Sequence, residues 1–173
     1  MQGKINVNIV LCQKYDDSTK TIEQMFNEIT TNERNEASFS VITFINAIGD
    51  IQDLGNGFVL HYFLMKKAVA KNQKRQGIYL GAVDFTVNSE EEYEKDNYLS
   101  SSNSTYGSLT FEKVPFLEQG EYSIEVYKGS SLENKDESYT SLKKNASRYM
   151  EEGELISSMF FQVRLRNQNK RLF

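Results

Sequence analysis

One histidine and one cysteine limit the nucleophilic and metal chemistry that this chain can carry. His61 is the only histidine, so a Ser–His–Asp or Cys–His site would have to include it. It lies inside the apolar run 58–65, where we expect a partly buried sheet histidine that is hydrogen-bonded to a neighbour. Cys12 is expected to be a small buried residue, because a reactive thiol needs an exposed, electropositive setting. These residue types predict no catalytic or cofactor-binding residues and no cofactor.

Carboxylates are densest between residues 90 and 96. Calcium takes about six to eight oxygen ligands, which sandwich domains collect from loops at one end, so Asp16 and Asp17 would join if the loops coincide. The spacing does not match the Asp-x-Asp-x-Asp-Gly loop pattern, and we therefore predict a solvated acidic loop and no metal site, with calcium as the alternative. The cluster comprises Glu90, Glu91, Glu92, Glu94 and Asp96.

Basic residues are concentrated in two places, the 66–75 segment and the C-terminal tail. Together they would form a stripe for a phosphate backbone. No aromatic residues alternate with them as a stacking platform for single strands requires, and the formal net charge of −4 opposes a nucleic-acid footprint. We therefore expect no nucleic-acid partner. The residues are Lys66, Lys67, Lys71, Lys74 and Arg75, and then Arg164, Arg166, Lys170 and Arg171.

Length and composition predict one soluble domain over residues 1–173. The chain is 39% hydrophobic and 12% aromatic, too rich in these residues for a disordered protein. The single cysteine favours a reducing, cytoplasmic setting. The apolar stretch 5–12 is too short and too polar for a signal peptide, and no run reaches the roughly 18 apolar residues that predict a membrane span. Low proline and high asparagine and lysine usage favour a bacterial source.

Alternating hydrophobicity predicts a mainly β, all-β fold, a single two-layer β-sandwich of about eight strands. Within the apolar run 58–65, Phe58, Leu60, Tyr62 and Leu64 should share the core face, with His61 on the other. The 22–29 segment fits either a short strand or a helical turn, and Pro115 predicts an edge strand or a strand end. The predicted strand segments are 5–12, 22–29, 39–45, 58–65, 78–87, 109–116, 122–128 and 159–165.

Two polar insertions interrupt the strands, at about 88–106 and 130–157. The second carries apolar residues at helical spacing and predicts a short helix lying on the sandwich. Tyrosines in both insertions are candidates for a partner surface, because tyrosine offers contact area at low entropic cost, although loop packing is the alternative. They are Tyr93, Tyr98, Tyr106, Tyr139 and Tyr149.

Three segments together resemble a family of small uncharacterised bacterial β-sandwich proteins. They are the opening strand that ends in Leu11-Cys12, the Met25–Ile29 segment, and the Val114–Val126 segment with its Gly-x-Tyr-x-apolar-x-Val strand, followed by a last strand over Phe160–Leu165. The resemblance covers mainly the two ends of the chain. It implies the sandwich fold and brings no activity with it.

The function that these observations favour is a non-catalytic protein-binding or assembly module. Protein partners, including a second copy of the chain, would bind at the insertions or at exposed strand edges. One alternative is a C2-like domain that binds calcium, carbohydrate or an anionic lipid at its loop end. The other is an enzyme that uses scattered carboxylates together with His61.

Overall fold

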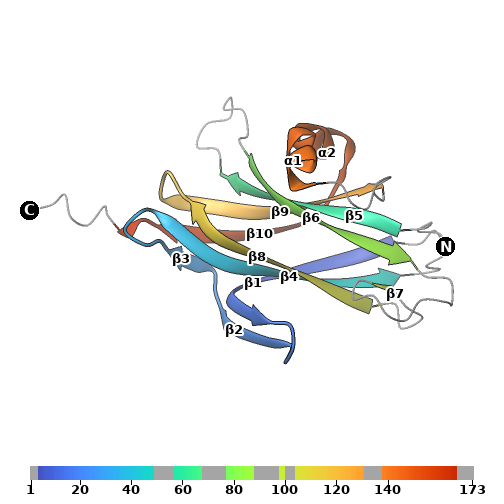
Figure 1. Cartoon of the computed structure of the whole chain (residues 1–173), viewed down its shortest axis with the longest axis horizontal. Coiled ribbons are helices and arrows are strands. Elements are labelled where there is room, and N and C mark those ends of the chain that lie inside the picture. The colour runs from blue at the N-terminus through green and yellow to red at the C-terminus, as the bar shows by residue number, and fades with distance from the viewer. Residues whose placement is uncertain are drawn as a thin grey trace, which may run out of the picture.

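The computed structural model describes residues 4–48, 57–67, 77–87, 98–99, 104–130 and 138–166. In these ranges the chain forms ten strands and two short helices (Figure 1). The strands are β1 (Lys4–Asp16), β2 (Thr21–Met25), β3 (Glu28–Thr30), β4 (Glu36–Ile48), β5 (Gly57–Lys66), β6 (Gly77–Val87), β7 (Tyr98–Leu99), β8 (Ser104–Pro115), β9 (Gly120–Ser130) and β10 (Glu154–Arg164). The helices are α1 (Tyr139–Lys144) and α2 (Ala146–Glu152).

The strands form two sheets that pack face to face. One has the order β2-β1-β4-β8 and the other β3-β10-β9-β5-β6-β7. The mainly β, two-layer sandwich is therefore confirmed. The predicted 22–29 strand is two short strands on different sheets, because the chain crosses from one sheet to the other between β2 and β3.

Alternating side chains from both sheets fill the space between the layers. Phe58, Leu60 and Leu64 of β5 are each at most 2% exposed and belong to the main core cluster, as their spacing predicts. The four-stranded sheet contributes Leu11 and Phe39 to the same cluster. Burial of these side chains is the main term that stabilises the sandwich, at about 1.5–3 kcal/mol for each large apolar side chain.

One polar contact joins the two sheets through this core. The hydroxyls of Thr43 on β4 and Tyr62 on β5 lie 2.7 Å apart, and both residues are 1% exposed. Because each hydroxyl is the other's partner, neither is buried without a hydrogen bond. Burial raises the pKa of Tyr62, so its phenol stays neutral well into the alkaline range.

The two helices cover the outer face of the six-stranded sheet, over β5, β6 and β9 (Figure 1). A second apolar cluster forms between the helices and the sheet, from Phe63, Met65, Tyr79 and Tyr127 of the strands and Leu142 of α1. Strand β5 is therefore buried on both faces, which explains why its whole run is apolar. The helix predicted in the 130–157 insertion is present as two short helices that meet at Asn145.

Both insertions end earlier than the sequence predicts. Strand β8 begins at Ser104, where it pairs with Asn46 of β4, so Tyr106 lies in a strand. Strand β10 begins at Glu154, and the register with β9 shifts between Leu155 and Ser157. In β10 this irregularity breaks the period of two that marks a strand in sequence, which is why the first residues of that strand were assigned to the insertion. No helix in the described ranges is long and apolar enough to cross a membrane.

Candidate functional site

Strand β8 is the last strand of the four-stranded sheet, and its outer side has no strand partner in the part of the chain that the structure describes. Its first eight residues, 104–111, read Ser-Thr-Tyr-Gly-Ser-Leu-Thr-Phe and carry no charge. Glu112, Lys113 and Pro115 follow, the residue types that protect the edges of sheets, and Pro115 ends the strand as predicted. Within the described ranges, the outward main-chain donors and acceptors of the uncharged stretch therefore form an open edge.

A cavity of about 370 Å³ lies between this edge and the other sheet. Residues 106–109 of β8, residues 82–84 of β6 and Asp17 line it. Gly107 sets how closely β8 and β6 approach each other, because a Cβ at this position would lie 3.0 Å from Cζ of Phe85 and 3.3 Å from Cγ1 of Val83. The open edge thus borders a pocket that could accept side chains of an added strand.

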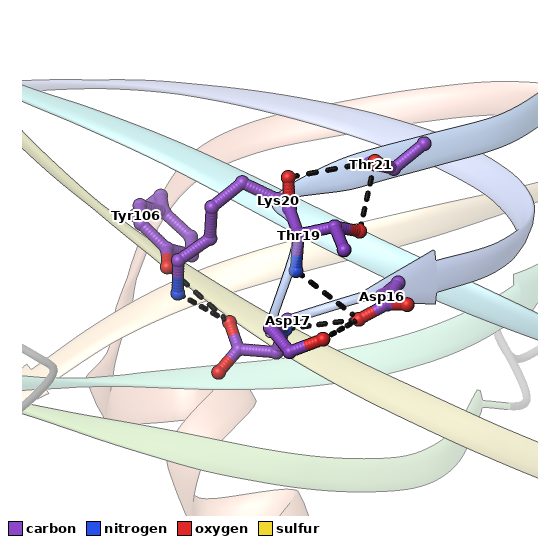
Figure 2. A network of polar contacts seen from close by, with 7 residues as sticks. Asp16, Asp17, Thr19, Lys20, Thr21 and Tyr106 are labelled. Atoms are coloured by element: carbon purple, nitrogen blue, oxygen red, sulfur yellow. Dashed lines mark hydrogen bonds and ion pairs between the residues drawn. The ribbon is translucent and has the colours of Figure 1, made fainter.

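The tip of the β1–β2 hairpin lies against β8 at Tyr106. Beyond Cys12, β1 no longer pairs with β4 and pairs only with β2, so the end of the hairpin leaves the strand pairing of the sheet (Figure 1). Figure 2 shows the contact at its tip: the Tyr106 hydroxyl donates to Oδ1 of Asp17 at 3.2 Å, and Nζ of Lys20 lies 2.9 Å from the same oxygen. Lys20 Nζ also lies 4.9 Å from the centre of the Tyr106 ring, and the ring of Tyr15 meets that ring edge-on. We call Tyr15, Asp17, Lys20 and Tyr106 the hairpin clasp.

The turn beneath the clasp is held by Asp16. Its Oδ1 accepts hydrogen bonds from the backbone and hydroxyl of Ser18, at 2.9 and 2.6 Å, and from the backbone of Thr19 at 3.3 Å. An aspartate that caps its own turn in this way favours a tight reversal of the chain. Lys20 adopts the left-handed conformation with φ 55°, which few non-glycine residues do.

The pKa shifts in the hairpin follow from the contacts that hold its turn. Hydrogen bonds from Ser18 lower the pKa of Asp16, and Lys20 lowers that of Asp17. Hydrogen bonding to Tyr106 and Asp17 raises the pKa of Lys20, and burial raises that of Tyr15. Each of these shifts moves the pKa of the group further from 7, whereas a general acid or base works best with a pKa near the operating pH.

Cys12 is buried as the sequence predicts, and His61 has a hydrogen-bonding neighbour as predicted but is fully rather than partly buried. His61 is 1% exposed, its Nδ1 lies 3.1 Å from the Tyr79 hydroxyl, and its ring stacks on that of Tyr149 at 3.8 Å. Buried Glu125 lies on the neighbouring strand and accepts a hydrogen bond from Tyr127 at 2.9 Å. Cys12 is fully buried, and its burial raises the pKa of the thiol.

The tyrosines predicted to form a partner surface occupy separate parts of the molecule. Tyr139 and Tyr149 come together over the six-stranded sheet, where the Tyr139 hydroxyl donates to the Tyr79 carbonyl at 3.0 Å. Tyr106 belongs to the hairpin clasp, far along the chain from the helices. Only the backbone of Tyr98 is described, in β7, and Tyr93 lies outside the described residues. Partner binding by these tyrosines stays a prediction.

The charged clusters are only partly described. Residues 90–96 lie outside the described ranges, within which no three His, Cys, Asp or Glu residues are grouped to hold a metal. From the basic set, Lys66 pairs with Glu118, Lys67 with Glu121 at 2.6 Å, and Arg164 with Glu28 at 2.9 Å. Lys71, Lys74, Arg75, Lys170 and Arg171 lie outside the described residues.

Sequence reasoning missed the hairpin clasp. Asp17 was considered only as a calcium ligand, and Tyr106 only as a loop tyrosine. The Asp-Asp-Ser-Thr-Lys stretch at 16–20 does carry a turn signal, which predicts the reversal. Nothing in the sequence pairs that turn with Tyr106, which is 89 residues from Asp17.

Comparisons with known proteins identify no family. No protein-family model and no curated protein matches the chain. Among solved structures, the chain is similar to part of a β-glucosidase from Listeria innocua in complex with glucose, at 11% identity and a TM-score of 0.44. A second structure of β-glucosidase from Listeria innocua matches at 12% identity and a TM-score of 0.44. Each match covers 93% of this chain and 16% of the enzyme chain. Likeness this distant carries neither activity nor substrate to this protein, and the resemblance to the bacterial family stays a prediction.

Proposed function

We propose that the protein is a non-catalytic assembly module in which the open edge of β8 pairs with an extended segment of a protein, first of all the same edge of a second copy. The observation that carries this is the uncharged stretch 104–111 at the end of a sheet. An edge of this kind offers unpaired N–H and C=O groups that a further strand can satisfy. Strand addition uses these main-chain groups for affinity and adjoining pockets for specificity.

The chemistry of β8 suits pairing with itself. Two copies related by a twofold axis would place the stretch 104–111 antiparallel to itself, so each side chain would face a residue of the same stretch. Like charges directly opposite each other destabilise strand pairs, and this stretch has none. Glu112, Lys113 and Pro115 would limit the paired length to the uncharged part.

Several features support a binding role over an enzymatic one. The carboxylates of the hairpin have lowered pKa values, and His61 is buried under α2 with its ring stacked on Tyr149. The single cysteine supports a cytoplasmic setting, and low proline with high asparagine and lysine usage supports a bacterial source; both are part of the same proposal.

Sedimentation velocity over a wide concentration range tests this proposal. Ser108 is half-buried on β8, and S108K would place a lysine, a residue that blocks edge pairing, in the middle of the stretch. The matched control is N46K, which adds the same charge at an exposed position of the interior strand β4 in the same sheet. We expect wild type and N46K to form a dimer as concentration rises, and S108K to remain a monomer. A wild-type protein that is monomeric throughout, or an S108K variant that dimerises as wild type does, would refute it.

A further inference from the structure

A second, larger pocket of about 530 Å³ lies where the chain crosses between the sheets, from β2 to β3. Both sheets hold the crossing segment in place: the Phe26 amide donates to the Leu11 carbonyl at 3.2 Å, and the Gln162 amide donates to the Asn27 carbonyl at 2.8 Å. The volume lies within the roughly 300–1,000 Å³ that is usual for small-molecule sites. A pocket between two anchored sheets is largely preformed.

The walls also fix the backbone of the two cationic residues that line the pocket. The Arg166 amide donates to the Thr31 hydroxyl at 3.3 Å, and the Lys113 amide donates to the Ser38 hydroxyl at 3.1 Å. Lys113 and Gln24, which also lines the pocket, have φ values of 54° and 52°. Left-handed conformations cost energy for such residues and are concentrated at functional sites.

The two carboxylates of the lining are already engaged by the protein. Glu28 forms an ion pair with Arg164 at 2.9 Å, and Glu36 accepts a hydrogen bond from the Asn32 side chain at 3.2 Å. The lining carries two cations, Lys113 and Arg166, and these two carboxylates. Because Arg164, which lies outside the lining, neutralises Glu28, the lining cations are not both balanced by free carboxylates.

The groups left for a ligand are cations, amides and a hydroxyl. The side chains of Lys113 and Arg166 are exposed and form no ion pair in the described part of the chain. Gln13, Gln24 and Thr30 are also exposed and make no side-chain hydrogen bond within the described ranges. A guanidinium and an ammonium are donors that suit an oxyanion, whereas amides both donate to and accept from neutral hydroxyls.

We infer that this pocket binds a small hydroxylated organic anion of the sugar-phosphate or sugar-acid class. Arg166 and Lys113 hold the oxyanion, and Gln13, Gln24 and Thr30 hold the hydroxyls. The site takes Lys113 from the charged end of β8, outside the stretch 104–111, and does not depend on the assembly proposed above.

Titrations followed by ¹H–¹⁵N correlation spectra test this inference with four probes: glucose 6-phosphate, glucuronate, glucose and inorganic phosphate. We expect glucose 6-phosphate, glucuronate or both to shift the amides around the pocket and to bind at least about tenfold more tightly than glucose, because hydrogen bonds to charged groups are the stronger ones. Binding of only one anion identifies the phosphate ester or the carboxylate as the recognised group.

Two variants and a control complete the design. The double variant K113Q/R166Q should weaken binding of the anion by about tenfold or more, whereas K143Q, which removes an exposed cation from α1, should leave it unchanged. Well-dispersed spectra of the variants show that they are folded. Equal binding of glucose and the anions, binding that survives in K113Q/R166Q, or the absence of binding by all four probes would each overturn the inference.

Discussion

The hydroxyl pair that joins the two sheets should behave as a coupled unit. Thr43 Oγ1 and Tyr62 Oη lie 2.7 Å apart, and both residues are 1% exposed. Tyr62→Phe would leave the Thr43 hydroxyl buried without its partner, and Thr43→Val would do the same to the Tyr62 hydroxyl. Each single change should lower the free energy of unfolding by about 1–3 kcal/mol. The double variant replaces both groups with apolar ones of similar shape and should be at least about 1 kcal/mol more stable than the sum of the two losses predicts.

Urea unfolding of the wild type, the two single variants and the double variant measures this coupling. Tyr122→Phe is a suitable control, because it also removes one hydroxyl, which donates to the Glu118 carbonyl at 2.8 Å away from the Thr43–Tyr62 pair. Its effect should add to that of Thr43→Val within about 0.5 kcal/mol. Losses in the double variant that equal the sum of the single losses would show that the two hydroxyls do not depend on each other, and the reasoning would be wrong.

Three further changes test other parts of the structure. Because burial raises the pKa of Tyr62, the unfolded chain loses this phenol proton near pH 10 while the folded chain keeps it. The free energy of unfolding should therefore fall above about pH 10, and it should fall less steeply in Tyr62→Phe. Urea titrations at pH 9 and 11 measure this difference. Leu142→Ala should cost about 2–3 kcal/mol, because Leu142 is buried between α1 and the sheet, whereas Lys143→Ala should stay within about 0.5 kcal/mol by calorimetry. Asp17→Asn weakens the clasp with Tyr106 and should speed amide exchange in the β1–β2 hairpin without moving the melting temperature; unchanged exchange would contradict the role given to the clasp.

Much of the core could be predicted from sequence because one face of each strand is buried. The inward positions of Phe58, Leu60 and Leu64 follow from alternation alone, and so does the placement of His61 on the opposite face. Alternation alone does not predict that His61 is fully buried on that face. Strand β5 is apolar on both faces because helices more than 70 residues further along the chain cover its outer face. The sequence shows only that both faces of this strand are buried, and not which elements bury the outer one.

The parts that could not be predicted depend on contacts between distant residues or on irregular backbone. Ile29 is buried and Met25 is 70% exposed, although both belong to one apolar segment, because the chain changes sheets between them. The hairpin clasp needs a reversal beyond Cys12 that brings Asp17 to Tyr106. Neither local propensity nor period encodes such a contact, so the sequence predicts the layers and not the contacts between distant residues at their edges.

Amide hydrogen exchange along β8 tests the central claim most directly. If two copies pair through this edge, exchange at residues 104–111 should slow as protein concentration rises, and S108K should abolish the slowing. Strand β2, another edge of the same sheet, serves as the internal reference and should exchange at a rate independent of concentration. Exchange at 104–111 that is equally fast at every concentration, or equally slow in wild type and S108K, would contradict assembly through the open edge of β8.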